Sequence, residues 1–546
     1  MTGTEISILF VDDDLGRYEA DLREHLGKSQ PSWALAFAHS HPEAQAALAA
    51  HAPDAVVLDV ELTAGGREGI SLLRFVRRHL PKTPVLILTG ISDARTIRDA
   101  LLAENASDDA KTEELDPEAL LFKEEILGSG RFDVLEWKIS RALHKYGRVA
   151  NATGVLVTHG TDTMAWGLCY LRYALKNLTA NVAVTGSQVP LEGYFSLSDA
   201  LGNLKTSVYL LNRLRPAHLF AVFNNGQSVF SGRLNKYRKW DADAFEGRLA
   251  ASASADGMTS LRKDWVFIPR KGQRLQDLHL IRTGGTIESQ RDGDELGGLK
   301  PTGDFVWKYL NDSLSSLFVN PHRHDLFALD SSNMSYEHWA ALALQIEKIG
   351  VAQADTAFDP TVKPVIANPC FTTDDYAMQF GMCGRGAVFA GYGGGNANVM
   401  EASDRSVLPA LKEAVRAGKV VAVTSQVPLE SYDAEYAAGL ALLEAGGIPC
   451  GDLPLADAQV KLSYILGHQA VLEEASARTG LSRHFLVAAA FLAGVSMRKA
   501  KSLEVFKSIM ARRGEPVVVL PDDPFISKPF AQGLETVIEA CVSCRI

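Results

Sequence analysis

With 546 residues, the chain is too long for a single hydrophobic core, and we expect roughly three domains. Hydrophobic residues at 47% and charged residues at 22% are ordinary values for globular proteins, so sizeable cores can be buried. The formal charge of -10 at pH 7 argues against a nucleic-acid partner and against a surface that binds anionic membranes.

The six cysteines are few for this length and mostly lie in apolar surroundings, which is typical of a reducing compartment. Cys541 and Cys544 have a suggestive spacing, but without a second pair this is a weak metal or redox signal, and a tail without a role is the favoured interpretation. No signal peptide or membrane span is readable in the sequence, so we expect a cytoplasmic protein.

Four short apolar runs in residues 1–128 each end in polar side chains. They end at Asp12 and Asp13, at Asp59, at Thr89 and at Lys123. Amphipathic stretches lie between the runs, and this alternation predicts a parallel sheet that delivers the polar groups to one edge. Clustered carboxylates at such an edge suit Mg²⁺, which prefers one or two carboxylates together with phosphate oxygens.

Residues 1–128 resemble the receiver domain of two-component response regulators, which implies a flavodoxin-like parallel sheet. The resemblance implies that Asp12, Asp13 and Asp59 hold Mg²⁺. It also implies that Asp59 accepts a phosphoryl group from a histidine kinase or another phosphodonor, that Thr89 is the switch hydroxyl, and that Lys123 contacts the phosphate.

The segment departs from the receiver family in two places. The stretch before Lys123 is long and contains an acidic insertion at residues 103–118, and Glu124 takes the place of the usual proline. A degenerate receiver that serves only for docking or dimerisation is therefore the alternative.

The motif HGTDTM (159–164) follows an apolar run at residues 155–158. The run predicts a buried strand that delivers two hydroxyls and a carboxylate into a strand-to-helix turn. Ligands bind at such turns in open α/β sheets. The alternative is that the Thr and Asp side chains only cap the following helix, since both are common N-caps.

Three further motifs follow predicted strands, namely VTGSQVP (184–190), TGGTI (283–287) and DSSNM (330–334). In TGGTI, two glycines let the backbone turn sharply and leave the hydroxyl of Thr286 projecting. Taken singly, TGGTI also fits a tight connection and DSSNM a helix cap. The basic cluster at residues 233–239 contains Lys236, and the usual interpretation of such a cluster is a solvated surface loop.

Together the four motifs are specific to one family, and residues 131–475 resemble the bacterial-type L-asparaginase/glutaminase family. The resemblance implies that Thr286 is the nucleophile and that Lys236, nine positions before Phe245 as in the family, is the catalytic amine. The other residues that the resemblance assigns are catalytic Thr161 and Asp162, and substrate-binding Ser331, Ser332, Asp162, Ser187 and Asn396.

The implied chemistry is hydrolysis of an amino-acid amide without a cofactor. Lys236, its charge balanced by Asp162, would activate Thr161 or a water molecule, because a threonine hydroxyl is a poor nucleophile without a basic partner. Backbone N–H groups near Thr161 and Ser187 would stabilise the oxyanion. Asn396 would reach the substrate from a neighbouring subunit of a homo-oligomer, a dimer or a tetramer.

The order of the motifs departs from the family, in which TGGTI precedes HGTDT. We therefore predict a permuted amino-terminal domain at residues 131–350, with the old start joined through the Ala- and Ser-rich residues 250–256. A smaller asparaginase-like carboxy-terminal domain is expected at 360–475. The extension at 476–546 is predicted to contain helices at 483–492 and 502–512 and a strand at 516–520, and packing or oligomerisation is its favoured role.

The predicted fold class is thus α/β, a receiver-like domain followed by a two-domain asparaginase-like fold. The family's tyrosine in the loop after TGGTI is absent from residues 288–301, where Leu299 occupies the expected position. The main prediction is an amidohydrolase acting on L-asparagine, or on L-glutamine, under receiver control. The alternatives are a catalytically weakened, receiver-controlled amino-acid sensor and the amidase component of a transamidation complex.

Overall fold

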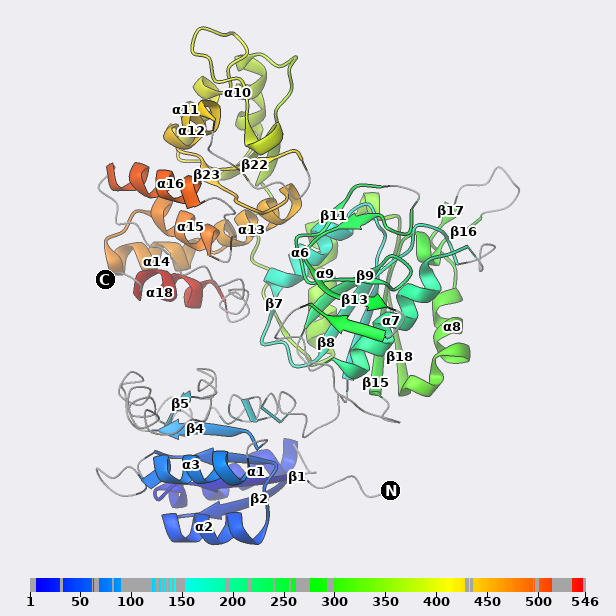
Figure 1. The fold of residues 1–546 in the computed structure, drawn as a ribbon, viewed down its shortest axis with the longest axis vertical. Coiled ribbons are helices and arrows are strands. Elements are labelled where there is room, and N and C mark those ends of the chain that lie inside the picture. Colours follow the sequence, from blue (N-terminus) through cyan, green and yellow to red (C-terminus); the bar gives the residue numbers. More distant parts are fainter. Residues whose placement is uncertain are drawn as a thin grey trace. The chain divides into compact units, whose positions relative to one another are not determined.

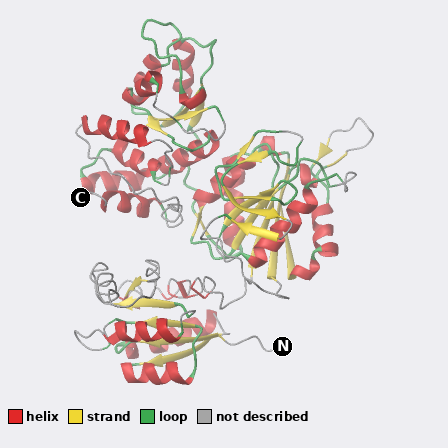
Figure 2. Cartoon of the chain, viewed as in Figure 1, coloured by secondary structure: helices red, strands yellow, loops and turns green. Residues whose placement is uncertain are grey.

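The computed structural model divides into two compact units, residues 1–150 and 151–546, which are described separately (Figures 1 and 2). The described residues are 6–29, 33–60, 62, 68–80, 83–89, 120–123, 127–128, six positions between 132 and 143, 153–191, 197–214, 218–238, 241–254, 257–261, 275–291, 299–427, 432, 436–493, 495, 500–512 and 533–543. The predicted acidic insertion, Glu124, the strand at 516–520 and Cys544 lie outside these ranges. Across these ranges, no helix is both long and apolar enough to cross a membrane.

The first unit is built on a five-stranded parallel sheet in the order β2-β1-β3-β4-β5. Its strands are β1 (Ile6–Val11), β2 (Trp33–Ala38), β3 (Ala55–Leu58), β4 (Val85–Thr89) and β5 (Leu120–Phe122), and its helices include α1 (Glu19–Ser29), α2 (His41–Ala50) and α3 (Glu68–His79). This strand order is the flavodoxin-like one, whose ligands bind beyond the carboxyl ends of β1 and β3.

Both faces of this sheet are buried because side chains alternate along each strand. Ile8 and Phe10 of β1 pack into one core with α1, and the intervening residues of β1 pack into a second core with α2 and α3. Leu135, Ile139 and Leu143, spaced every four residues, also pack into the first core. The stretch that contains them was predicted to open the second domain, but its apolar side chains complete the core of the first unit.

The second unit contains an eight-stranded sheet in the order β14-β13-β10-β9-β8-β6-β15-β18. Its strands are β6 (Thr153–Thr158), β8 (Asn181–Thr185), β9 (Leu219–Phe223), β10 (Ser228–Phe230), β13 (Leu249–Ser254), β14 (Gly257–Ser260), β15 (Leu275–Gly284) and β18 (Phe318–Leu329). The five strands from β9 to β18 in this order are parallel, and β10, β13 and β14 extend the sheet in antiparallel fashion.

Helices cover both faces of this sheet (Figure 1). Those on one face are α6 (Met164–Ala174) and α9 (Tyr336–Lys348), and those on the other are α7 (Ala200–Arg213) and α8 (Phe305–Ser313). Within β6, Val155 and Val157 pack toward α6, whereas Leu156 packs toward α7. The apolar run before HGTDT is therefore a central strand buried on both faces.

One prediction about this sheet was wrong, and one strand is longer than the sequence indicates. The predicted Ala/Ser-rich joint at 250–256 is mostly strand, since β13 pairs with both β10 and β14. Ala250 and Ala251 are fully buried there, and their small side chains fit under close neighbours although alanine has little strand preference. The strand that precedes DSSNM is longer than its apolar residues 326–329 indicate and begins at Phe318, because an edge strand tolerates the polar and proline-containing residues 320–325.

The smaller domain has a parallel sheet in the order β20-β21-β22-β23. Its strands are β20 (Lys363–Ile366), β21 (Gly386–Gly391), β22 (Val420–Ser425) and β23 (Ile448–Pro449), and its helices are α10 (Thr373–Met382), α11 (Leu408–Arg416), α12 (Ala437–Glu444) and α13 (Leu455–Gly467). Helix α13 packs both on this sheet and against α6, so one continuous core joins the two domains of the second unit.

The carboxy-terminal extension is helical where it is described. After α14 (Gln469–Thr479), the predicted helix at 483–492 is present as α15 (Arg483–Leu492), and the next begins slightly earlier than predicted, as α16 (Ala500–Arg512). A further helix, α18 (Leu534–Ser543), was missed. Phe485, Phe506 and Val537 all enter the core that contains α13, so these helices complete the packing of the smaller domain.

Candidate functional site

The HGTDT turn does more than cap helix α6. The N-cap residue of α6 is Thr163, which makes no side-chain cap hydrogen bond. Its hydroxyl instead donates to the carbonyl of Ser331 at 2.7 Å. Thr161 is buried, and Asp162 remains exposed at the mouth of the turn. The capping-only interpretation is therefore wrong.

Lys236 connects the two polar side chains of this turn. Its Nζ donates to Oγ1 of Thr161 and to Oδ1 of Asp162, each at 2.7 Å. The side chain of Lys236 is only 18% exposed. Lys236 lies on β11 (Asn235–Lys236) and pairs with Phe245 on β12 (Phe245–Glu246), so the nine-residue spacing noted in the sequence corresponds to a short hairpin.

The loop that leads to Lys236 is anchored at Arg233. The guanidinium of Arg233 lies 3.4 Å from Oδ2 of Asp457 on α13 and 3.1 Å from Oδ1 of Asp452. Arg233 is buried and has a positive φ of 56°, an unusual conformation for a residue with a side chain. The basic cluster is thus not wholly a solvated loop, because its first member ties the Lys236 hairpin to the smaller domain.

The TGGTI turn lies directly against the HGTDT turn. Strands β15 and β6 are parallel neighbours, and beyond them Gly285 faces Gly160. A Cβ atom at Gly285 would lie 2.5 Å from the amide nitrogen of Gly160, so both positions need a hydrogen in place of a side chain. Thr161 directly follows Gly160 and Thr286 directly follows Gly285, so this contact places the two threonines in adjacent turns.

Ser331 completes the convergence of three turns. Its hydroxyl accepts a hydrogen bond from the amide of Asp162 at 3.2 Å, and a Cβ atom at Gly160 would lie 2.5 Å from it. Ser332 is exposed, and both its amide and its hydroxyl donate to Asp330. Asp330 thus caps the short turn η6 (Ser331–Asn333), while Ser331 contacts the HGTDT turn directly.

Ser187 lies in the neighbouring turn after β8. Its hydroxyl donates to the carbonyl of Val189 at 2.7 Å. Because the hydroxyl is engaged in this way, the group of Ser187 that can serve a site is its backbone N–H. A Cβ atom at Gly186 would overlap the carbonyl oxygen of His159, so this turn also touches HGTDT. Asn203 on α7, which the sequence did not single out, holds the turn by donating to the carbonyl of Gly186 at 3.0 Å.

Asn396 belongs to the smaller domain. It follows the turn η7 (Gly393–Gly395), in which Gly394 has a φ of 63°, and its Nδ2 donates to the carbonyl of Gly393 at 2.9 Å. Its Oδ1 is buried without a hydrogen-bond partner among the described residues. That Asn396 contacts the substrate bound to a neighbouring subunit stays a prediction.

His159 is a buried, neutral residue beneath the site. Nε2 accepts a hydrogen bond from Nε1 of Trp339 at 3.2 Å, and Nδ1 lies 2.7 Å from the carbonyl of Gly160, which assigns the proton to Nδ1. Burial lowers the pKa of His159 to about 4. Gly167 makes room for this contact, since a Cβ atom there would lie 2.8 Å from Nε2 of His159.

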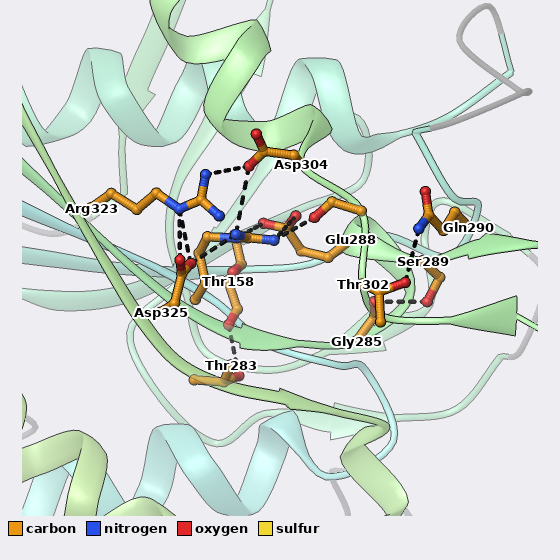
Figure 3. A network of polar contacts seen from close by, with 12 residues as sticks. Thr158, Thr283, Gly285, Glu288, Ser289, Gln290, Thr302, Asp304, Arg323 and Asp325 are labelled. Atoms are coloured by element: carbon orange, nitrogen blue, oxygen red, sulfur yellow. Dashed lines mark hydrogen bonds and ion pairs between the residues drawn. The ribbon is translucent and has the colours of Figure 1, made fainter.

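A network of charged residues that sequence reasoning missed lies behind the TGGTI turn (Figure 3). Arg282 at the end of β15 makes two hydrogen bonds to Glu288, at 3.0 and 2.9 Å, and a third to Asp325 on β18 at 2.7 Å. Arg323 contacts Asp325 and Asp304 from the other side. The signal available in the sequence was an arginine within the apolar run of β15 and a glutamate within the turn, which must pair if both are buried.

The first unit has a separate polar cluster at its sheet edge. Nζ of Lys123 lies 2.7 Å from Oδ1 of Asp12 and 3.3 Å from Oδ2 of Asp59. Oxygen atoms of Asp12, Asp13 and Asp59 lie within 4.8 Å of one another. Burial raises the pKa of Asp12 above its ordinary value, although Lys123 acts in the opposite direction. Thr89 ends β4 beside β5, and nothing is described of its side chain.

Comparison with known proteins finds matches to two asparaginase family models, the first of which begins within the first unit. Residues 111–261 match the family model for the N-terminal domain of asparaginase, and residues 369–477 match that for the glutaminase/asparaginase C-terminal domain. The structure is accordingly an α/β protein with a two-domain asparaginase-like fold. The two matched segments together span just under half of the chain, and the amino-terminal match ends before TGGTI.

Among relatives, the D subunit of the glutamyl-tRNA(Gln) amidotransferase of Thermococcus kodakarensis is 23% identical over 344 residues, 62% of this chain and 59% of that protein. The corresponding protein of Pyrococcus furiosus is 24% identical over 59% of this chain and 56% of its own length. The chain thus spans less than two thirds of these relatives. L-asparaginase 1 of Escherichia coli (strain K12) is 37% identical over 93 residues, 17% of this chain and 26% of that protein.

Two solved structures are also similar. The thermostable L-asparaginase from Thermococcus kodakarensis has 22% sequence identity and a TM-score of 0.38, covering 62% of this chain and 77% of that one. L-asparaginase I from Vibrio cholerae O1 biovar eltor str. N16961 has 16% identity and a TM-score of 0.36, covering 76% and 93%.

Proposed function

We propose that the protein hydrolyses the side-chain amide of L-asparagine, or of L-glutamine, and releases ammonia. The observation that carries the proposal is Lys236, whose Nζ lies 2.7 Å from both the hydroxyl of Thr161 and the carboxylate of Asp162. A hydroxyl, an amine and a carboxylate in direct contact at strand ends are the groups that activate a nucleophile. The asparaginase-family domains support the same reaction class.

In the proposed mechanism, the Oγ1 of Thr286 attacks the amide carbon and the C–N bond breaks. The proton given up by the Thr286 hydroxyl passes to the departing nitrogen, which leaves as ammonia. Water, activated through Thr161 and Lys236, then hydrolyses the ester and restores the Thr286 hydroxyl. Backbone N–H groups of the HGTDT turn and of the turn at Ser187 stabilise the oxyanion. Asp162, Ser331 and Ser332 bind the α-amino and α-carboxylate groups of the substrate.

A second candidate function is the amidase component of a transamidation complex. It is supported by the two relatives that align over 62% and 59% of the chain, since both are named as D subunits of glutamyl-tRNA(Gln) amidotransferases. The two functions share the same site chemistry. They differ in that an isolated asparaginase releases ammonia alone, whereas an amidase component needs its partner.

We further propose that the amino-terminal domain of the second unit is permuted. Strand β15, which carries TGGTI, lies between β6 and β18 although β7 to β14 separate it from β6 in the sequence. The pairing supports permutation because the two halves form one sheet, and separate sheets would have contradicted it. The connection at 262–274 lies outside the described residues.

We also propose that the first unit is a receiver that binds Mg²⁺ at Asp12, Asp13 and Asp59 and is phosphorylated on Asp59 by a histidine kinase or another phosphodonor. The residues fit a cation because Oδ2 of Asp12 is buried without a hydrogen-bond partner among the described residues. The ion would neutralise charge on the incoming phosphoryl group. Lys123, already in contact with Asp59, would then hold a phosphate oxygen.

The test is an ammonia assay on the purified protein with asparagine and with glutamine, each with and without Mg²⁺ and a small phosphodonor. Release of ammonia that Thr286→Ala abolishes supports the proposed hydrolase, and no release from either substrate contradicts it. A rate that changes with the phosphodonor only when Asp59 is intact would support receiver control. The same rate in the parent and in Asp59→Asn under all conditions would contradict it.

A further inference from the structure

The turn that carries Thr286 is held by its own third residue. Thr286, Ile287 and Glu288 form the single turn η4 (Thr286–Glu288). Ile287 is anchored in the core on the α7 side of the sheet, and the side chain of Glu288 is fully buried. The position and orientation of the Thr286 hydroxyl therefore depend on what fixes Glu288.

Glu288 is fixed by a bidentate ion pair with Arg282. Nε and Nη2 of Arg282 bond to the two carboxylate oxygens of Glu288 at 3.0 and 2.9 Å, the fork geometry in which neither partner can rotate freely. The carbonyl of Glu288 accepts from the amide of Gly303 at 2.7 Å, and Arg282 donates to the carbonyl of the same glycine. The end of the turn is thus held through both side chain and backbone.

Arg282 also links this turn to the strand that leads to Ser331. Its Nη1 donates to Asp325 on β18 at 2.7 Å, while its Nε and Nη2 donate to Glu288. Strand β18 ends just before Asp330 and Ser331. One guanidinium therefore connects the turn of the proposed nucleophile with the strand that presents the substrate-binding serine.

We propose that Arg282 and Glu288 are positioning residues for Thr286, and that their ion pair holds the η4 turn in its reactive geometry in a loop that lacks tyrosine. The inference rests on the proposed hydrolase function. Neither residue is assigned a contact with substrate. Stability alone does not account for the pair, because a buried ion pair gains little over apolar side chains of similar volume.

The experiment compares conservative variants at this pair with the same changes at an ion pair elsewhere. Glu288→Gln keeps the shape of the side chain but removes its charge, and Arg282→Lys keeps the charge but removes the fork. The control pair is Arg385 and Asp359 in the smaller domain, whose Nε–Oδ2 distance is 2.7 Å and whose carboxylate is also buried. The matched control variants are therefore Asp359→Asn and Arg385→Lys.

Two measurements are made below the melting temperature of every variant, namely kcat and KM for ammonia release and amide hydrogen exchange of the segment 283–291. We expect kcat to fall between about 10- and 100-fold in Glu288→Gln and Arg282→Lys, as for a displaced reacting group, with KM changed less than about threefold. We also expect exchange of the segment to accelerate. The control variants lower the melting temperature without either effect.

Unchanged exchange of this segment in both Glu288→Gln and Arg282→Lys would overturn the inference, as would a kcat close to that of the parent in both. If the parent protein releases no ammonia from asparagine or glutamine, the proposed function fails. The exchange measurement still decides in that case whether the pair holds the turn.

Discussion

The amine of Lys236 is shared between two consecutive side chains, with 2.7 Å to the hydroxyl of Thr161 and 2.7 Å to the carboxylate of Asp162. A single cation therefore orients both groups of the HGTDT turn. Lys236 is itself paired with Phe245 in a short hairpin, so the backbone that carries the amine is also held in place.

Lys236→Met is expected to lower kcat for ammonia release by about 10² to 10⁴, the usual contribution of a positioned acid or base. Lys236→Arg should not restore activity, because a guanidinium does not give up its proton. The exposed Lys205 on α7 provides the control, and Lys205→Met should leave kcat unchanged. Steady-state kinetics on asparagine and glutamine make the comparison, and full activity of Lys236→Met would contradict the assigned role.

Gly285→Ala is expected to abolish activity and to destabilise the protein, because the added Cβ would meet the backbone of Gly160. Gly350 is a matched control, since its φ of 86° is close to the 82° of Gly285 but nothing lies within 4 Å of an added Cβ. Gly350→Ala therefore reports the backbone strain alone. Denaturant unfolding and the ammonia assay should separate the two variants, and equal effects would mean that the Gly160–Gly285 contact is unimportant.

His159 is expected to make the protein less stable as the pH falls from about 6.5 to about 4. Burial lowers its folded-state pKa to about 4, so in this pH range the imidazole is protonated in the unfolded chain but neutral in the folded protein. The neutral imidazole thus contributes stability above pH 6.5, at most roughly 3 kcal/mol, which is lost as the pH falls. Unfolding free energies measured on the two sides of this range, near neutral pH and near the folded-state pKa, should differ less in His159→Gln than in the parent.

Glu288 is expected to have the opposite effect. Burial raises its pKa to about 6 despite Arg282, so the folded protein binds a proton more readily than the unfolded chain between the ordinary value of 4.5 and 6. Its contribution to stability is greatest below pH 4.5 and is lost as the pH rises through 6. The charged groups that face it are Arg282, Asp304, Arg323 and Asp325.

Because protonation of Glu288 weakens the ion pair with Arg282, kcat should also fall as the pH is lowered through about 6. The pH profile of kcat measures this, and Glu288→Gln should lack that acid limb while retaining a uniformly low kcat. If the pH profile of kcat in Glu288→Gln keeps an acid limb with the same midpoint, the limb reports the titration of another group.

Mg²⁺ binding to the first unit is expected to require Asp12 and Asp59. Asp12→Asn and Asp59→Asn should each abolish calorimetrically detected Mg²⁺ binding in the full chain, because hard cations need charged oxygen ligands. Asp14→Asn is the control, since the exposed Asp14 neighbours the cluster but does not belong to it. Equal loss of binding in all three variants would indicate a general effect of charge.

The sequence predicted the ends of strands better than their beginnings. HGTDT and TGGTI stand out because a buried parallel strand must end in a polar turn, and parallel strands bring their carboxyl ends to one edge. The spacing of Lys236 and Phe245 likewise corresponds to an observed strand pairing. The first half of β18 was not predicted, because an edge strand need not be apolar and its residues lack an apolar pattern.

The contacts that hold the turns in place could not be predicted from the sequence. Arg282 and Glu288 are six positions apart, and their pairing depends on how η4 folds back beside β15. Arg233 and Asp457 are separated by most of the second unit and meet only because α13 packs against α6. Such pairs arise from tertiary packing, which local propensity and periodicity do not encode.

The place of β15 in the large sheet has a consequence for synthesis and truncation. Strand β6 is made early, yet one of its two neighbours is β15, which leaves the ribosome only after β7 to β14. Until then β6 exposes an unpaired central edge with the fully apolar Val155, Leu156 and Val157, the kind of edge on which strands of other molecules pair. A fragment that stops before residue 275 should therefore aggregate. In the complete sheet, the polar strand β18 forms the edge beyond β15.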